Sequence, residues 1–186
     1  MKKGEVKLKK GFTIIETSLV LAVAGLIFLM VFLALPALQR SQRDANRRED
    51  MMSFASNLKN YQTNNRGALP VSSGIGSSGL LVNPDSIEDN ASETSWAGFY
   101  RDYLEDDFAD PDGPKYKLLV IKCSASSVGS ICQKTADQIG EYPNDNKIVV
   151  TLQALCSGED AVAAANPRRV AISYKLEGGG IYCGSS

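Results

Sequence analysis

The longest hydrophobic pattern in the chain is an uncharged apolar run of 20 residues, from Leu19 to Leu38. An α-helix rises about 1.5 Å per residue, so this run spans about 30 Å, which is the hydrocarbon thickness of a bilayer. The residues just before it, 12–18, contain a single charged side chain, Glu16. The pattern therefore predicts a membrane-spanning helix over residues 12–38.

A second helical pattern follows the apolar run. Residues 39–50 are polar, with arginines and acidic residues at helical spacing, which predicts a solvated helix. Apolar side chains then recur every three or four residues, as expected for an amphipathic helix that supports a core: Met51, Phe54, Leu58 and Tyr61. The segment 64–67 supplies a stop signal. We therefore expect one helix of about 50 residues from near Phe12 to near Asn64, with its amphipathic half at 39–65.

Loop signals and short strands make up the remainder. Residues 66–114 combine a surface loop rich in serine and glycine, at 71–95, with aromatic and aliphatic side chains that are spaced as on a short helix: Trp96, Phe99, Tyr100, Tyr103 and Leu104. Residues 115–186 contain runs with β-strand character at 115–122, 147–153, 169–176 and 181–183. The predicted fold class is α+β, with a long N-terminal helix packed on a small antiparallel sheet.

The distribution of charge indicates how the chain is oriented in a membrane. Residues 1–11 hold five lysines and one glutamate, a charge of +4, whereas the whole chain carries −1. Positively charged flanks tend to stay in the cytoplasm, which favours a single-pass protein with its N-terminus inside and its C-terminal part outside. The side chains after residue 11 sum to −5, so total charge gives no sign of nucleic-acid binding.

Four cysteines lie on the predicted outer side: Cys123, Cys132, Cys156 and Cys183. An even number in that compartment indicates disulfides, for which three connectivities are possible. We favour Cys123–Cys132, which closes a short loop, together with Cys156–Cys183, which ties down the C-terminal residues. A four-thiolate zinc site is the alternative, although the chain has no Cys-x-x-Cys spacing and no histidine.

The junction before the apolar run carries a specific motif. The segment Lys10-Gly11-Phe12-Thr13-Ile14-Ile15-Glu16 resembles the class III signal of type IV pilins and pseudopilins, in which Lys-Gly precedes Phe-Thr-x-x-Glu and an apolar stretch. The resemblance implies that residues 1–11 are a leader peptide. A prepilin peptidase would cleave between Gly11 and Phe12 and methylate the new amine of Phe12.

The resemblance also implies a role for Glu16 in assembly. An ionisable group within a membrane span costs about 2.5–3.5 kcal/mol near the centre and less toward the edge, so an isolated carboxylate needs a partner. In a filament, Glu16 would face the terminal amine of a neighbouring subunit and neutralise it. The implied partners are identical subunits, minor pilins, the prepilin peptidase, an inner-membrane assembly platform and a cytoplasmic assembly ATPase. The implied location is the inner membrane before assembly and the extracellular pilus afterwards.

Closely spaced aspartates precede a Gly-Pro pair: Asp106, Asp107, Asp110 and Asp112. Calcium binds several carboxylate oxygens, so Asp110 and Asp112 are candidate calcium ligands. The segment 110–114, Asp-Pro-Asp-Gly-Pro, also contains the residues that a tight turn requires, and we favour the turn. It is similar to the Asp-Pro-x-Gly segment of major type II secretion pseudopilins. No other cofactor is indicated.

The chain carries no recognisable catalytic pattern. Without histidine, serine or cysteine triads and histidine-based metal centres are excluded, and no glycine-rich phosphate loop follows a strand. We expect a structural protein and not an enzyme: a type IV pilin that polymerises into an extracellular filament. The alternatives are a pseudopilin of a type II secretion or competence system and a monomeric membrane-anchored binding domain, such as an adhesin.

Overall fold

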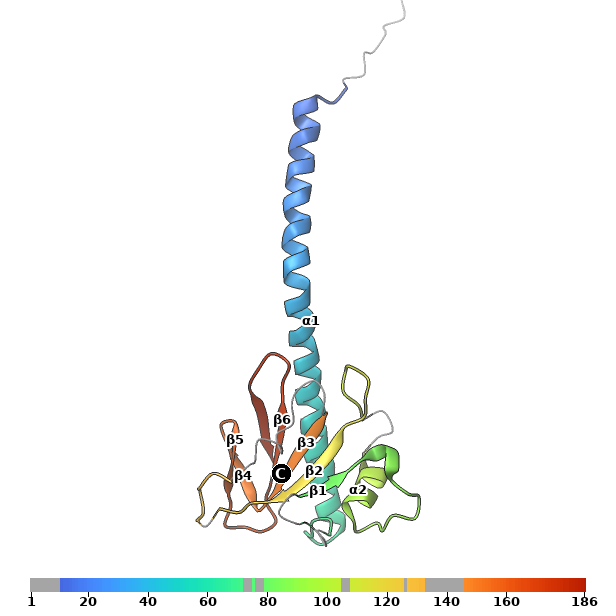
Figure 1. The fold of residues 1–186 in the computed structure, drawn as a ribbon, viewed down its shortest axis with the longest axis vertical. Coiled ribbons are helices and arrows are strands. Elements are labelled where there is room, and N and C mark those ends of the chain that lie inside the picture. The colour runs from blue at the N-terminus through green and yellow to red at the C-terminus, as the bar shows by residue number, and fades with distance from the viewer. Residues whose placement is uncertain (1–10, 72–74, 76–78, 105–107, 126, 133–145) are drawn as a thin grey trace, which may run out of the picture. The chain divides into compact units, whose positions relative to one another are not determined.

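The structure is a computed structural model, and it describes residues 11–71, 75, 79–104, 108–125, 127–132 and 146–186 (Figure 1). By its internal contacts the chain divides into two compact units, Met1–Arg40 and Ser41–Ser186. Helix α1, Ile14–Asn64, begins in the first unit and ends in the second. It ends where the stop signal predicted, and it begins two residues after Phe12.

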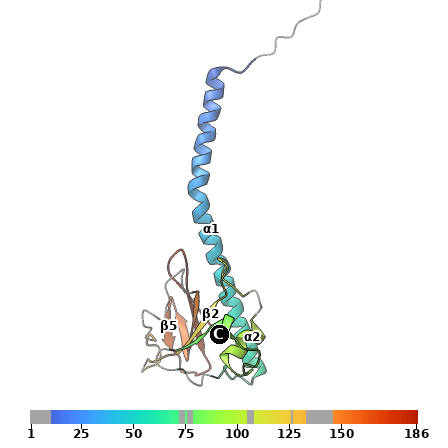
Figure 2. The same ribbon diagram turned by 45° about the vertical axis from the view of Figure 1, so that its right-hand side comes forward.

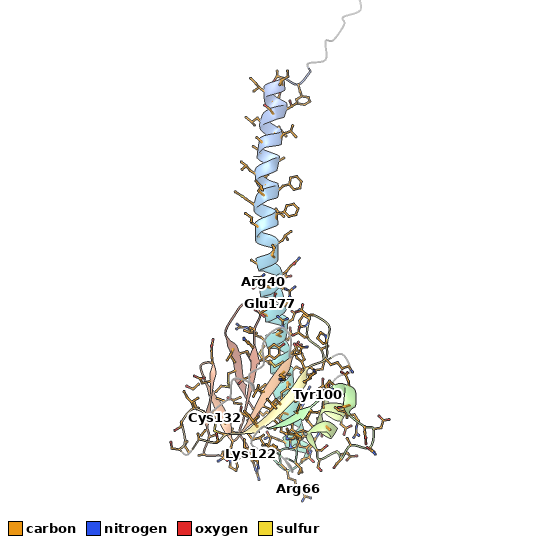
Figure 3. All side chains as sticks on the ribbon, in the orientation of Figure 1. Arg40, Arg66, Tyr100, Lys122, Cys132 and Glu177 are labelled. Carbon is orange, nitrogen blue, oxygen red and sulfur yellow. A yellow bond between two sulfur atoms is a disulfide. The ribbon has the colours of Figure 1, made fainter. Side chains whose placement is uncertain are left out.

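The first unit is helical from Ile14 onward and exposes its apolar side chains. Phe12, Phe28 and Leu33 are 83%, 66% and 80% exposed, and side chains project from the helix along this stretch (Figure 3). Among the described residues, α1 is the helix long and apolar enough to cross a membrane, and it lies near the N-terminus. This length and composition are those of a membrane anchor and also of a signal sequence.

The second unit contains a five-stranded sheet in the order β1-β2-β3-β6-β7 (Figure 1). Its strands are β1 Leu80–Val82, β2 Lys117–Lys122, β3 Lys147–Leu152, β6 Val170–Lys175 and β7 Ile181–Ser185. A separate antiparallel pair consists of β4 Ala154–Ser157 and β5 Asp160–Ala163. The predicted α+β class, with a long apolar N-terminal helix and a small sheet, is therefore confirmed.

The expectation of a fully antiparallel sheet is wrong for one pair of strands. Strands β2 and β3 run parallel, in register from Lys117 opposite Lys147 to Lys122 opposite Leu152, while the other neighbouring pairs are antiparallel. A parallel pair needs a crossover of a dozen or more residues, and the long segment between these strands provides it. Alternation along a strand reports burial and carries no information about direction.

The core lies between the sheet and the helices. The predicted stripe of α1 is fully buried or nearly so, and it packs with the inner residues of β2, β3 and β6. Helix α2, Trp96–Tyr103, lies beside this part of α1 in both views (Figures 1 and 2). Its Phe99 ring contacts Phe54 and Tyr61 edge-on, with centroids 5.7 and 5.6 Å apart. The predicted short helix is thus confirmed, and its aromatic face packs on the core.

Within the expected surface loop at 71–95, the described residues 79–95 are more regular than predicted. It contains strand β1, which pairs with β2, and a 3-10 helix η1 at Pro84–Ser86. The serine- and glycine-rich residues before Leu80–Val82 favoured a loop, and three apolar residues are too few to show a period.

Two disulfides join the cysteines in the pairing that we favoured, Cys123–Cys132 and Cys156–Cys183. The second bond connects β4 to β7 and thereby attaches the small strand pair to the last strand of the sheet.

Candidate functional site

The predicted processing junction lies in irregular backbone directly before α1. Residues 11–13 are non-helical and exposed, and open space surrounds the α-carbon of Gly11 on the side where a Cβ would lie. The hydroxyl of Thr13 accepts a hydrogen bond from the backbone N–H of Glu16, 3.3 Å away, and so caps the first turn of the helix. The peptide bond between Gly11 and Phe12 is therefore accessible and lies just outside the helix.

Glu16 occupies the first turn of α1 and is exposed. A carboxylate at this position interacts favourably with the partial positive charge of a helix N-terminus. None of the ion pairs found in the described part of the chain includes Glu16. Its side chain is thus available to a cation of another molecule.

The other polar groups at this border are satisfied within the helix. The hydroxyl of Thr17 donates to the carbonyl of Ile14, and the hydroxyl of Ser18 donates to the carbonyl of Ile15, both at 2.9 Å. Such bonds let hydroxyls lie in an apolar environment without a free donor. Glu16 is therefore distinct from its neighbours, because its carboxylate has no such internal partner in the described residues.

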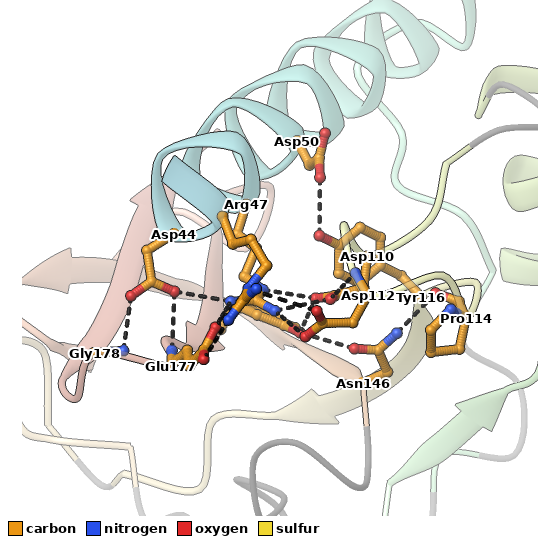
Figure 4. Close-up of polar contacts among 12 residues, drawn as sticks. Asp44, Arg47, Asp50, Asp110, Asp112, Pro114, Tyr116, Asn146, Glu177 and Gly178 are labelled. Atoms are coloured by element: carbon orange, nitrogen blue, oxygen red, sulfur yellow. Dashed lines mark hydrogen bonds and ion pairs between the residues drawn. The ribbon is translucent and has the colours of Figure 1, made fainter. Parts of the chain in front are cut away.

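A second polar site lies in the other unit, and we name it the Arg47 cluster: Arg43, Asp44, Arg47, Asp110, Asp112 and Glu177 (Figure 4). The expectation that residues 39–50 form a wholly solvated helix is wrong here. Arg47 is fully buried, and Asp44 and Asp110 are 8% and 3% exposed.

Arg47 is bound by three aspartates. Its Nε and Nη2 atoms donate to the two carboxylate oxygens of Asp110, at 2.7 and 2.9 Å. Nη2 also donates to Asp112 at 2.8 Å, and Nη1 donates to Asp44 at 2.9 Å. Paired, bidentate contacts of this kind offset the cost of removing a guanidinium from water.

Asp44 and Arg43 bind the turn between β6 and β7. The carboxylate of Asp44 accepts hydrogen bonds from the backbone N–H groups of Glu177 and Gly178, at 2.9 and 2.7 Å. Arg43 donates to both carboxylate oxygens of Glu177, at 2.8 and 2.6 Å. One turn of α1 thus fixes the position of two loops that are distant in sequence.

Two acids of the cluster, Asp110 and Glu177, have lowered pKa values. Burial acts to raise the pKa of Asp110, but hydrogen bonds from Arg47, from the N–H of Asp112 and from Tyr174 outweigh it, so this pKa is lowered. The hydrogen bonds from Arg43, opposed by a smaller effect of burial and supported by Arg47, lower the pKa of Glu177 to about 2. Both carboxylates therefore stabilise the fold in their charged form.

Two tyrosines extend this polar network into the core. The hydroxyl of Tyr174 donates to Asp110 at 2.8 Å and lies 2.9 Å from the amide oxygen of Asn146. The hydroxyl of Tyr116 donates to Asp50 at 2.8 Å, and burial together with this bond raises the pKa of Tyr116. Each buried phenol thus has a partner.

The candidate calcium ligands belong to the Arg47 cluster. The backbone N–H of Asp112 donates to the side chain of Asp110, and the N–H of Gly113 donates to the backbone carbonyl of Asp110. These two bonds form the predicted turn. Asp110 and Asp112 both accept hydrogen bonds from Arg47. Within the described residues, no group of three or more potential metal ligands is arranged to hold an ion. Asp106 and Asp107 lie outside the described residues.

Comparisons of this chain with protein-family models, with curated proteins and with solved structures gave no match. The resemblance to type IV pilins and pseudopilins thus stands on the residues of the junction and the helix that follows it.

Proposed function

We propose that this chain is a type IV pilin, a structural subunit that polymerises into an extracellular filament. In this proposal, a prepilin peptidase cleaves between Gly11 and Phe12, and residues 12–38 then form the filament core. One observation carries the proposal: the Lys-Gly-Phe-Thr-x-x-Glu motif lies at an accessible junction directly before a helix with exposed apolar side chains.

The exposed apolar surface of α1 supplies the driving force for assembly. Contiguous apolar surface of this extent marks a membrane or protein interaction site. In a filament outside the bilayer, the helices of neighbouring subunits would bury it against one another, which is favourable by about 25 cal/mol per Å². The Ser41–Ser186 unit, with both disulfides, forms the coat of the fibre.

Glu16 makes assembly selective for cleaved subunits. Its carboxylate has no cation partner in the described residues, and cleavage after Gly11 creates a charged amine on Phe12. When the amine of one subunit meets Glu16 of the next, two charges that are costly in lipid neutralise each other. Uncleaved subunits lack this amine and would assemble poorly.

Mass spectrometry of the mature N-terminus, in protein purified from the cells that make it, tests the proposal. We expect a chain that begins with methylated Phe12, and an intact Met1 would instead indicate a simple membrane anchor. Gly11→Ala should abolish or strongly slow this processing. Gly25→Ala is the matched control, since Gly25 also has open space around it and lies outside the junction.

Fibre yield tests the role of Glu16. Glu16→Val should insert into the membrane and be cleaved normally but give few filaments, whereas the exposed control Glu49→Gln should assemble as the unaltered chain does. A normal fibre yield for Glu16→Val would contradict charge pairing.

A pseudopilin of a type II secretion system is the second candidate, favoured by the Asp-Pro-x-Gly segment at 110–113. The two candidates differ in the effect of deleting the gene. Loss of long surface fibres supports the pilin, while loss of protein secretion with surface fibres unchanged supports the pseudopilin.

A further inference from the structure

A groove of about 380 Å³ lies at the free edge of β1, between this strand, the segment 83–95 and the start of α2. We name it the β1 groove. Its lining is mixed: Val71 and Leu81, which are 51% and 52% exposed, contribute apolar surface, while Asn83 and Ser86 contribute polar groups. A ligand suited to this lining has an apolar face and hydrogen-bonding groups at its edge.

One acceptor beneath the lining of the groove has no partner among the described residues. The side-chain oxygen of Asn83 is buried and accepts no hydrogen bond from the described residues. Asn83 precedes η1, yet its side chain does not cap that helix. Because this oxygen is enclosed, a hydroxyl in the groove would reach it only after the Asn83 side chain turns toward the groove, and the new bond would then satisfy the acceptor.

The rim of the groove carries a modification motif. Asn90 lines the groove and begins the sequence Asn90-Ala91-Ser92, which is the single Asn-x-Ser/Thr motif in the chain. Asn90 and Ser92 are both exposed. This motif is the acceptor signal for N-linked glycans in exported proteins.

The backbone on both sides of Asn90 is held in place. The Nη1 atom of Arg101 donates to the carbonyls of Asp89 and Ala91, at 2.6 and 3.1 Å. The N–H of Ala91 donates to the carbonyl of Glu88 at 3.0 Å, which closes a turn around Asn90. The acceptor asparagine is thereby kept at the rim of the groove.

We propose that Asn90 carries an N-linked glycan and that the β1 groove holds its first sugar. A sugar ring offers both an apolar face, which would cover Leu81, and hydroxyl donors, one of which would bind the oxygen of Asn83 once that side chain turns toward the groove. This inference rests on the outward orientation of the Ser41–Ser186 unit in the proposed function.

The reaction requires a sugar donor of one chemical class, an oligosaccharide linked to a lipid diphosphate. The amide nitrogen of Asn90 forms a bond to the anomeric carbon of the sugar. The bond between that carbon and the phosphate oxygen breaks, the lipid diphosphate leaves, and the amide releases a proton.

Peptide mass spectrometry of the protein from its native cells tests the modification. We expect the peptide that contains Asn90 to carry a sugar mass, which Asn90→Gln and Ser92→Ala both remove. The exposed control Asn60→Gln lies outside any such motif and should leave it in place. An unmodified Asn90 peptide in the unaltered protein overturns the inference.

The same spectra separate this inference from the proposed function. Methylated Phe12 together with an unmodified Asn90 would overturn the glycan and support the filament subunit. A sugar on Asn90 together with an intact Met1 would support the glycan and contradict the filament subunit.

Thermal unfolding tests the groove. The melting temperature of the glycosylated protein should exceed that of Asn90→Gln by a few degrees, and Asn83→Ala should reduce this difference. If Asn83→Ala leaves the difference unchanged, the sugar does not bind in the groove, and that part of the proposal fails.

Discussion

Arg47 shows how one residue can organise a domain. A buried guanidinium is tolerated only when its charge and its donors are matched, and Arg47 has Asp44, Asp110 and Asp112 around it. These partners come from α1 and from the turn before β2, so their positions are set together. Removing the guanidinium would leave buried carboxylates without a counter-charge.

We therefore expect Arg47→Ala to lower the free energy of unfolding by about 3–5 kcal/mol, the usual result of breaking a buried ion pair. Urea unfolding of the detergent-solubilised chain measures this, with the fluorescence of the single, fully buried Trp96 as probe. Arg48→Ala is the control, because Arg48 is exposed and its loss should change the stability by no more than about 0.5 kcal/mol. Equal effects of the two substitutions would contradict the role of Arg47.

The lowered pKa values of Asp110 and Glu177 predict acid sensitivity. A carboxyl whose pKa is lower in the folded than in the unfolded state stabilises the fold above its ordinary pKa of about 4, and this contribution is lost as the pH falls. We expect the urea concentration at the unfolding midpoint to decrease as the pH is lowered from about 4.5 to about 2. The decrease should be smaller in Glu177→Gln. An identical pH dependence in that variant would show that Glu177 is not responsible.

The burial of Arg47 was predictable in part from its spacing. Residues 44, 47, 51, 54, 58 and 61 of α1 are all buried and recur every three or four positions, so the apolar stripe extends backward onto Asp44 and Arg47. We did not assign Asp44 and Arg47 to the buried stripe, because charged side chains are usually solvated. The acids that bind Arg47 from outside α1 are distant in sequence, and no local pattern identifies them as its partners.

At the scale of elements, α2 depends on the close approach of its own preceding loop. A Cβ added at Gly98 would lie 2.2 Å from the carbonyl oxygen of Ser92 and 2.8 Å from the α-carbon of Glu93. Both are backbone atoms, so the clash cannot be relieved by rotating a side chain.

We expect Gly98→Ala to destabilise the protein by about 1–3 kcal/mol, although alanine is favoured over glycine in an exposed helix. Thermal unfolding followed by Trp96 fluorescence measures the effect. Gly25→Ala, in open space on α1, should leave the melting temperature unchanged or raise it slightly. A stabilising effect at Gly98 would mean that the loop moves away easily.

The disulfide between β4 and β7 should contribute more stability than Cys123–Cys132, which closes a shorter loop. Cys183→Ser opens a loop with a sequence separation of 27 and should cost about 2–4 kcal/mol. Cys123→Ser opens a loop with a separation of 9, and the chain-entropy model makes its cost smaller by about 1 kcal/mol. Melting temperatures under oxidising and reducing conditions measure both, and a Cys183→Ser variant that melts like the unaltered protein would refute the larger contribution.

Long, strongly patterned elements were the predictable ones. The end of α1, helix α2 and the four longer strands were found from periodicity and turn signals. Strands β1, β4 and β5 were missed, since they have only three or four residues each. The parallel pairing of β2 with β3 was also missed, because it depends on the crossover between them.

At the scale of the molecule, the Ser41–Ser186 unit should fold without the apolar run. A fragment that begins at Ser41 keeps every residue of the Arg47 cluster, and it lacks the apolar run. We expect this fragment to remain folded without detergent, with native Trp96 fluorescence.

A fragment that begins at Met51 is the informative comparison. It lacks Arg43, Asp44 and Arg47 and leaves Asp110 without its guanidinium partner. Its free energy of unfolding should be lower by about 3 kcal/mol or more. Equal urea midpoints of the two fragments would show that the cluster is dispensable.

The two-part organisation was predictable from the sequence, because an uncharged apolar run of 20 residues is typical of a helix that crosses a bilayer. The meeting of two loops on one turn of α1 was not predictable, since those loops are separated from Asp44 and Arg47 by 63 residues or more.

The bonds of Asp44 also bear on the order of events during synthesis. Asp44 and the backbone group of Glu177 that it binds are 133 residues apart, so α1 leaves the ribosome long before its last partner exists. Until then the carboxylate of Asp44 lacks the two backbone donors that it has in the finished domain, which opposes early burial of this part of the helix. Synthesis of the hairpin of β6 and β7, rather than synthesis of α1, is thus the step after which this domain can complete its folding.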